Sequence, residues 1–250
     1  MGQPDFKDHF SGVASGYAVH RPTYPAAVVD YLADQAAHRD LAWDAGCGSG
    51  QLSTLLAARF DKVIATDPSA AQIAQARPHP QVQYRQSSAE ASGLDAASAD
   101  LAVAAQAAHW FDLPRYYAEV RRVVRPGGLI ALLAYGVVHV ERDLVAIVDR
   151  FYWQTLAGFW PQERRIVEEG YRSLPFPFPE IRAPAFAMTA TWSLPELLGY
   201  VRTWSAVQAI ERARGGEAYA GFARALSAAW GDPDRRRDVR WDLALRLGRV

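Results

Sequence analysis

Apolar residues recur along the first half of the chain in short runs that are separated by segments of helical spacing. The runs with the length and composition of strands are 41–45, 62–67, 82–88, 99–106 and 129–135. Between them, helices are predicted at 52–59, 69–77 and 113–124. Strands that alternate with helices predict a parallel sheet with helices on both of its faces.

The second half of the chain begins with a long segment of helical spacing. Apolar residues recur every three or four positions within 140–160 and predict an inserted helix that is rich in aromatic side chains. The proline-rich stretch 175–179 is then expected to be extended, because proline lacks a backbone donor. Ser193 and Glu196 have the spacing of a capping box and predict the start of a helix that runs through Trp204. A further helix is predicted within 217–230.

The end of the chain alternates strictly between apolar residues and polar or small ones. The apolar positions are Val239, Trp241, Leu243, Leu245 and Leu247. This period of two predicts a last strand, which is expected to pair antiparallel with a sixth strand at 181–192. The pattern indicates no internal repeat, no low-complexity tract and no independent second domain.

Length, charge and cysteine content restrict the classes of function. A chain of 250 residues is long enough for one large α/β domain with an insertion. Basic and acidic residues balance at 27 each, so no overall field favours nucleic acid or an anionic membrane surface. The single cysteine, Cys47, excludes an internal disulfide and a cysteine-rich metal site, and is typical of a reducing compartment.

The chain also shows no sign of export or of membrane insertion. It has no secretory signal pattern at its start and no apolar run of about 18 residues. We therefore expect a cytoplasmic protein that acts on a small-molecule partner, with no membrane, nucleic-acid or metal partner. The sequence leaves the oligomeric state open.

Three glycines on alternate positions follow the first predicted strand, and Asp44 precedes them. Because Gly46, Gly48 and Gly50 lack a Cβ, backbone N–H groups in this turn can approach a ligand closely. The spacing does not fit a dinucleotide turn, since Gln51 stands where the third glycine belongs, and a phosphate loop would need a lysine that is absent. A carboxylate at Asp44 would repel a phosphate and attract an ammonium group. The pattern therefore favours a cationic cofactor that bears an amino acid.

Asp67 stands at the end of the second predicted strand. Ligands of open α/β sheets bind at the carboxyl ends of the strands, and a carboxylate there can accept hydrogen bonds from both hydroxyls of a ribose. A simpler alternative is a favourable charge at the start of the following helix. The glycine turn upstream favours ribose binding.

Asp44 and the three glycines resemble the first motif of the class I S-adenosylmethionine-dependent methyltransferases. In that family the turn wraps the methionine part of the donor, and the acidic residue lies near its amino group. The resemblance implies S-adenosylmethionine as the cofactor. It also implies a Rossmann-like, doubly wound sheet of seven mostly parallel strands, with an antiparallel last strand and a helical insertion that covers the site.

The ends of the third and fourth strands carry further candidate residues. Related methyltransferases often have an Asp-Ala-Glu type sequence that contacts adenine, and this chain has Ser88, Ala89 and Glu90 there. The Ser88 hydroxyl can accept from the adenine amino group, although a polar strand end without a ligand is an alternative. Including the turn, the residues expected to bind the donor are Asp44, Gly46, Cys47, Gly48, Gly50, Gln51, Asp67, Pro68, Ser88, Ala89, Glu90 and Gln106.

The segment after the fourth strand is expected to lie beside the transferable methyl group. It lacks the Asn-Pro-Pro-Tyr or Asp-Pro-Pro-Tyr sequence of enzymes that methylate nucleic-acid bases, so such substrates are not expected. His109 is the candidate catalytic residue, because the unperturbed pKa of histidine suits a general base. Its alternative role is a contact near the cofactor. Trp110 and Phe111 are expected to pack.

The N-terminal segment resembles a subgroup of type 11 methyltransferase domains that includes trans-aconitate methyltransferase-like proteins. The resemblance lies in Tyr17, the Arg21-Pro pair and the Tyr24-Pro pair. It implies that Tyr17 contacts the methionine part of the donor and that Arg21 lies at the cofactor and orients an acidic substrate, unless both only anchor an N-terminal helix. Tyr24, Tyr135 and Trp153 are the candidate contacts to the methyl acceptor.

We therefore predict a single methyltransferase domain over 1–250. It consists of an N-terminal helical cap (1–39), a cofactor-binding core (40–136), a helical insertion (137–180) and C-terminal strands and helices (181–250). The predicted reaction is methyl transfer to a small molecule, with a carboxylate as one candidate acceptor. A catalytically silent donor-binding protein and a nicotinamide-dependent oxidoreductase remain as alternatives.

Overall fold

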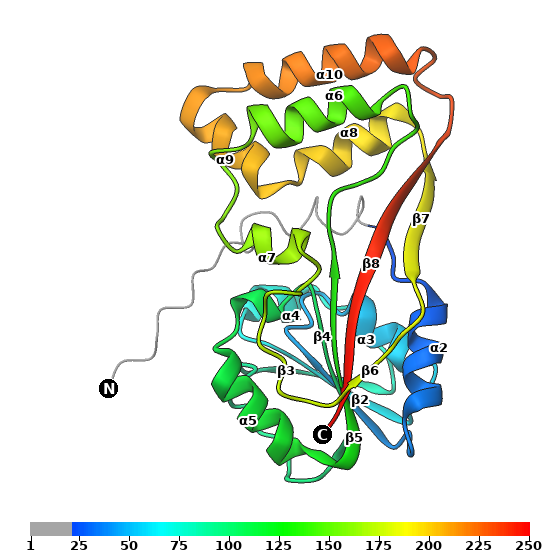
Figure 1. The fold of residues 1–250 in the computed structure, drawn as a ribbon, viewed down its shortest axis with the longest axis vertical. Helices are drawn as coiled ribbons and strands as arrows, with labels where there is room; N and C mark the ends of the chain where they lie inside the picture. Colours follow the sequence, from blue (N-terminus) through cyan, green and yellow to red (C-terminus); the bar gives the residue numbers. More distant parts are fainter. Residues whose placement is uncertain (1–21) are drawn as a thin grey trace.

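The computed structural model of the protein describes residues 22–250. The expected donor contacts Tyr17 and Arg21, and most of the expected N-terminal cap, lie outside the described residues. Within residues 22–250 the chain forms a sheet-based lobe and a helical lobe that lies beyond the carboxyl ends of the parallel strands (Figure 1).

The sheet of the described chain has eight strands in the order β3-β2-β1-β4-β5-β8-β6, and β7 pairs with β8 beside β6. The strands are β1 (Leu41–Ala45), β2 (Lys62–Asp67), β3 (Val82–Gln86), β4 (Ala99–Ala105), β5 (Val124–Tyr135), β6 (Glu180–Ile181), β7 (Phe186–Trp192) and β8 (Arg237–Arg249). The first five strands are parallel, whereas β8 is antiparallel to β5, β6 and β7. This arrangement confirms the Rossmann-like sheet with an antiparallel last strand.

Helices cover both faces of the sheet and build the second lobe. Around the sheet lie α2 (Ala26–Gln35), α3 (Gln51–Leu56), α4 (Ala70–Ala74), the 3-10 helix η1 (Ala108–Trp110) and α5 (Leu113–Val123). The helical lobe contains α6 (Val145–Asp149), the π-helix η2 (Arg150–Thr155), α8 (Leu194–Arg202), α9 (Ser205–Arg214) and α10 (Glu217–Trp230), and α7 (Arg164–Glu168) lies between the two lobes (Figure 1).

Side chains on opposite faces of β1 enter different cores. Ala42 packs in a core with α2, α3 and the helical lobe, and Trp43 packs with α5 on the other face. The indole of Trp43 donates to Thr66 Oγ1 at 2.9 Å, so even this buried polar atom is satisfied. The sheet is therefore covered on both faces, as its continuous apolar strands predict.

Several local signals in the sequence have the expected structure. Asp112 caps α5, where its side chain accepts from the backbone of Arg115. Ser193 and Glu196 form the predicted capping box of α8, with Ser193 N donating to Glu196 Oε2 at 2.7 Å. These motifs depend only on neighbouring residues, which is why the sequence alone identifies them.

Other expectations need correction. The predicted helix at 140–160 is shorter, because a loop precedes it and α6 continues directly into η2, which ends where Leu156 N bonds to Phe151 O in the wider π turn. Phe151 of η2 stacks on Phe222 at 4.2 Å between ring centroids. The expected sixth strand is split into β6 and β7, with Pro184 in the gap, so the sheet has eight strands and not seven. Helix α9 was not predicted as a separate element.

One buried carboxylate joins the starts of three strands. Asp100 Oδ2 accepts from the backbone of Asp40 at 2.8 Å and of Leu41 at 3.0 Å. Its Oδ1 accepts from Arg125 Nη1 at 2.7 Å, and the same nitrogen contacts the exposed carboxylate of Asp40. Asp100 therefore ties β1 to β4 and β5 at the edge opposite the carboxyl ends.

We expect Asp100→Ala to lower the free energy of unfolding by about 2–4 kcal/mol, because it leaves two backbone donors and a guanidinium without their buried partner. Asp40→Ala, which removes the exposed partner of the same arginine, should cost less than about 1 kcal/mol. Urea unfolding followed by circular dichroism measures both. Equal losses for the two variants would contradict this account.

Candidate active site

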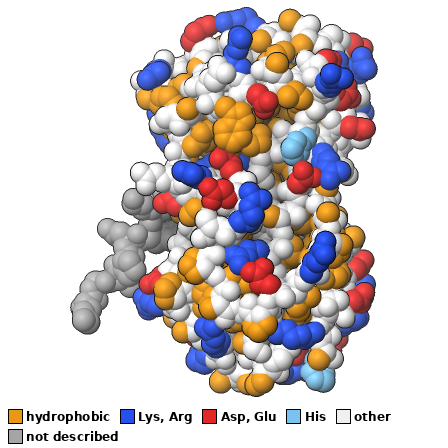
Figure 2. Space-filling view, viewed as in Figure 1, with side chains coloured by type: hydrophobic (Ala, Val, Ile, Leu, Met, Phe, Trp, Pro, Cys, Tyr) orange, Lys and Arg blue, Asp and Glu red, His pale blue; other side chains and the backbone are white. Residues whose placement is uncertain are grey.

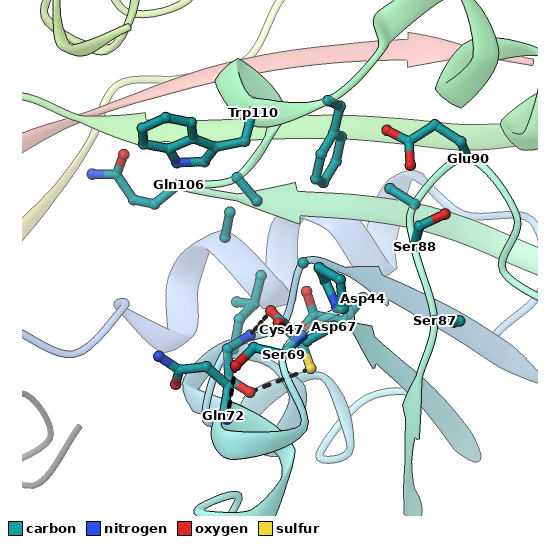
Figure 3. A pocket seen from close by; sticks show the side chains of 18 of the residues that line it. Asp44, Cys47, Asp67, Ser69, Gln72, Ser87, Ser88, Glu90, Gln106 and Trp110 are labelled. Carbon is teal, nitrogen blue, oxygen red and sulfur yellow. Dashed lines mark hydrogen bonds between the residues drawn. The ribbon is translucent and has the colours of Figure 1, made fainter. Parts of the chain in front are cut away.

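A cavity of about 1000 Å³ lies at the carboxyl ends of the parallel strands. Its wall comes from the turn after β1, the ends of β2 and β4, the loop after β3, η1 and the residue before α7. Figure 3 shows Gln106 and Trp110 on one side, Ser88 and Glu90 on another, and Asp44, Cys47 and Asp67 along a third. The topology thus brings together residues from seven separate stretches of the chain, which include Tyr24 and Tyr135.

The glycine turn forms one side of this cavity. Gly46, Gly48 and Gly50 have φ values of +69°, +55° and +80°, which disfavour other residues. A Cβ on Gly46 would lie 2.6 Å from the Cβ of Ala107, so the packing against the end of β4 excludes any side chain. A Cβ on Gly48 would meet no atom closer than 3.8 Å. Gly48 therefore leaves an open cradle above the backbone, into which a ligand can fit.

The turn is held in place by hydrogen bonds to β2. The backbone N–H groups of Gly46 and Cys47 both donate to Thr66 O, at 2.8 and 3.0 Å. Gly48 N donates to Asp67 Oδ2 at 2.9 Å. The turn and the end of β2 consequently form one rigid unit at the cavity.

Asp44 is buried beneath the turn, and Ser53 Oγ donates to its Oδ2 at 2.6 Å. Burial raises the pKa of Asp44 to about 7, the serine hydrogen bond lowers it, and the nearby charge of Asp67 raises it further. Near neutral pH the side chain is therefore poised between its neutral and charged forms. A cationic ligand in the cavity would favour the carboxylate.

Asp67 stands where the cavity meets the start of α4. Besides accepting from Gly48, its carboxylate accepts from Ser69 N at 2.9 Å. Ser69 in turn caps α4 by accepting from Gln72 N at 3.3 Å. Each carboxylate oxygen has a second lone pair, so the fixed side chain can still accept from ligand hydroxyls.

The loop after β3 supplies Ser88, Ala89 and Glu90 to the wall. Glu119 of α5 holds this loop, since Ser92 donates to it through both its backbone N–H and its hydroxyl, at 2.9 and 2.6 Å. The hydrogen bond from Arg122 is the main cause that lowers the pKa of Glu119 to about 2, so the acceptor stays ionised. The sequence did not reveal this role of Glu119, because it depends on a contact between distant segments.

Glu90 is itself positioned by a backbone N–H group at the start of α5. Its Oε1 accepts from Asp112 N at 3.0 Å, at the start of α5. The same helix therefore holds the loop after β3 at two points.

Gln106 ends β4 with a φ of +55°, an uncommon value for a residue with a side chain. Its Nε2 donates to the backbone oxygen of Tyr135 at 2.8 Å, across the ends of β4 and β5. The ring of Tyr135 packs edge-on against Tyr24 with 6.2 Å between centroids. Gln106, Tyr24 and Tyr135 all line the cavity, together with Trp110.

Three candidate residues among those described lie outside the cavity wall, namely Gly50, which caps the start of α3, His109 and Trp153. His109 does not line the cavity, and its Nδ1 is 2.8 Å from the Tyr171 hydroxyl. Burial lowers the pKa of His109 to about 3, with a smaller contribution from the charge of Arg164. The role of His109 as a proton acceptor stays a prediction. Trp153 is also absent from the wall, and about half of its surface is exposed.

The remaining predicted residues lie in the wall. They are Asp44, Gly46, Cys47, Gly48, Gln51, Asp67, Pro68, Ser88, Ala89, Glu90, Gln106, Tyr24 and Tyr135. The wall also contains residues that the sequence did not single out, among them Gln72, Arg115 and Glu163. Glu163 reaches the cavity only because the insertion folds back over the sheet, and no local motif marks it.

Two negative observations concern the described part of the chain. Residues 22–250 contain no group of three or more His, Cys, Asp or Glu side chains that could hold a metal ion. None of the described helices is both long and apolar enough to cross a membrane.

Comparisons with known proteins agree with this geometry. A methyltransferase domain family matches residues 43–132, from β1 into β5. A protein of Dictyostelium discoideum named as a methyltransferase is 34% identical over 214 residues, which cover 83% of this chain and 81% of that protein. An uncharacterized methyltransferase of Mycobacterium tuberculosis is 38% identical over 130 residues, about half of each chain.

A solved structure from Anaeromyxobacter dehalogenans, named as a type II methyltransferase, has the same fold over nearly its whole length. It is 51% identical in sequence with a TM-score of 0.88, and the match covers 92% of this chain and 97% of that one. These names do not test the trans-aconitate methyltransferase-like subgroup, which stays a prediction. The likeness in sequence and structure extends well beyond the glycine turn, and the chain belongs to the class I S-adenosylmethionine-dependent methyltransferases.

Proposed function

We propose that this protein transfers the methyl group of S-adenosylmethionine to a small molecule that binds in the same cavity. The observation that carries the proposal is the cavity at the strand ends, which has a polar, glycine-rich side and an aromatic side. Its volume of about 1000 Å³ is at the upper end of typical small-molecule sites, as expected where two molecules must meet. Family membership favours methyl transfer over the oxidoreductase alternative.

The residues present fit the donor. The open space above Gly48 accommodates the methionine part, and Asp44 lies below it as a partner for the ammonium group. We expect Asp67 to accept from the ribose hydroxyls and the loop with Ser88 and Glu90 to contact the adenine. When bound, S-adenosylmethionine supplies a methyl group on a positively charged sulfur that is already activated toward a nucleophile.

The task of the chain is then to hold the acceptor in line with that methyl group. Positioning two reactants in this way can supply roughly 7–11 kcal/mol of the barrier. The rigid link between Gln106 and Tyr135 fixes the ends of β4 and β5, and Tyr24 and Trp110 add apolar wall beside them. His109 supports this wall from behind, because its ring packs against Trp110 at 4.8 Å between centroids.

A small molecule suits the charge pattern better than nucleic acid. On the face shown in Figure 2, Lys and Arg side chains are interspersed with Asp and Glu, with no broad basic surface among the described residues. Within the described wall, Arg115 is the only basic side chain, and it lies next to Asp112 at the start of α5. A carboxylate acceptor would therefore need Arg115 or Arg21 as its partner, and Arg21 lies outside the described residues.

We expect Asp67→Ala to weaken S-adenosylmethionine binding by about 10- to 150-fold, because hydrogen bonds to a charged group contribute about 1.5–3 kcal/mol. Asp61→Ala, at the exposed opposite end of β2, should change the affinity less than about twofold. Isothermal titration calorimetry measures both, and a circular dichroism melt confirms that each variant is folded. Unchanged affinity in folded Asp67→Ala would overturn the donor site proposed here.

The raised pKa of Asp44 predicts a pH dependence of donor binding. As the pH rises through about 7, Asp44 loses its proton and gains the charge that attracts the donor's ammonium group. Affinity for S-adenosylmethionine should therefore rise by up to about tenfold per pH unit below pH 7 and level off above it. Asp44→Asn should remove this part of the dependence, and the difference between the two proteins cancels the ligand's own titration. Parallel pH profiles for both would contradict the role of Asp44.

A further inference from the structure

The residue before α7 places a carboxylate in the cavity wall. Glu163 is half-buried and comes from the insertion, not from the sheet-based core that carries the rest of the wall. Among residues 22–250, no side chain or backbone group forms a hydrogen bond or ion pair with its carboxylate. A half-buried charge without a partner is costly, and such a group is a candidate for binding a ligand.

The other carboxylates of the wall each have a partner within the protein. Their partners are Ser53 for Asp44, Gly48 and Ser69 for Asp67, the Asp112 backbone for Glu90, and the Arg115 backbone for Asp112. These bonds fix the donor side of the cavity. Glu163 differs because nothing in the described chain satisfies it.

The neighbours of Glu163 place it at the acceptor side. Helix α7 packs against the end of β5, where Glu168 Cα lies 4.0 Å from the position of a Cβ on Gly136. Arg164, the next residue in the chain, is close enough to His109 of η1 for its charge to act on that ring. Glu163 is therefore held near the ends of β4 and β5, which carry Gln106 and Tyr135.

The side chain of Gln106, which lies at the same strand ends, can also accept a hydrogen bond. Gln106 donates its Nε2 to Tyr135 O, which leaves its side-chain oxygen as an acceptor. Together with Glu163 it matches a group that carries several N–H donors, and the rings of Tyr24, Tyr135 and Trp110 give that group an apolar wall. A carboxylate acceptor would instead face the charge of Glu163.

We propose that Glu163 binds an N–H group of the methyl acceptor, and that the acceptor is a small organic amine. This inference rests on the proposed methyl transfer. The lone pair of the amine nitrogen forms a bond to the methyl carbon, the bond from that carbon to sulfur breaks, and its electron pair stays on the sulfur. The proton that the new ammonium releases passes to the carboxylate of Glu163 and then to solvent.

Sinefungin provides a probe that does not require the natural acceptor. In this analogue of S-adenosylmethionine, a carbon that bears an amino group replaces the methylated sulfur, so an ammonium group points toward the acceptor side. We expect the wild-type protein to bind sinefungin about tenfold more tightly than S-adenosylhomocysteine, which corresponds to about 1.4 kcal/mol. Glu163→Gln should remove most of this preference and leave the affinity for S-adenosylhomocysteine within about twofold.

A matched control removes a charge from the other end of the same helix. Glu169 follows α7, pairs with Arg165 and does not line the cavity. Glu169→Gln should prefer sinefungin over S-adenosylhomocysteine by the same factor as the wild type. Titration calorimetry with all three proteins measures the ratios, and thermal melts show that they are folded.

Three outcomes would overturn the inference. The first is that Glu163→Gln prefers sinefungin over S-adenosylhomocysteine as strongly as the wild type does. The second is that the wild-type protein shows no preference for sinefungin. The third is a loss of S-adenosylmethionine affinity in Glu163→Gln as large as the loss for sinefungin, because Glu163 would then act on the sulfonium of the donor. In each case S-adenosylhomocysteine still binds and the proposed function stands. Failure of the wild type to bind any of the ligands would overturn the proposed function as well.

Discussion

The close packing of the glycine turn against the end of β4 and against Tyr84 of β3 is the constraint on which the site depends. A side chain at Gly46 would collide with Ala107 at the end of β4, and one at Gly50 would lie 2.3 Å from the Tyr84 hydroxyl of β3. Only glycine fits at these two positions of the turn. Because the turn fits, its backbone stays at hydrogen-bond distance from Thr66 and Asp67, and the cavity has a fixed side before any ligand enters.

The second lobe is attached to this rigid unit through a shared core. Strand β8 pairs with β5 in the sheet and with β7 beside the helical lobe, and one apolar core extends from α2 and α3 to α8 and α10. Stacking of Phe151 on Phe222 joins the insertion to α10. The position of Glu163 above the strand ends is therefore set by packing between segments that are far apart in the sequence.

Some features of the structure are set by adjacent residues and others by contacts between distant segments, and only the first kind could be predicted from the sequence. The glycine turn, Asp67 at the end of β2 and the capping box at Ser193 each depend on a few adjacent residues, so their patterns were sufficient. The π-helix, the break at Pro184 and the presence of Glu163 in the wall depend on tertiary contacts that no local pattern records. The hydrogen bond of His109 to Tyr171 and its lowered pKa also come from distant parts of the chain, so the sequence could not predict them.

The central claim is that the close packing of the glycine turn shapes the donor site. Its most direct test compares two glycines that share a left-handed backbone conformation. Gly46 and Gly127 both have positive φ, but a Cβ on Gly127 meets no atom within 4 Å and lies far from the cavity. Each alanine variant should lose about 1–3 kcal/mol of stability from backbone strain, with a further loss from the collision in Gly46→Ala. In titration calorimetry, Gly46→Ala should lose at least about tenfold in S-adenosylmethionine affinity, and Gly127→Ala should stay within about twofold of the wild type. Wild-type affinity in folded Gly46→Ala would contradict the account.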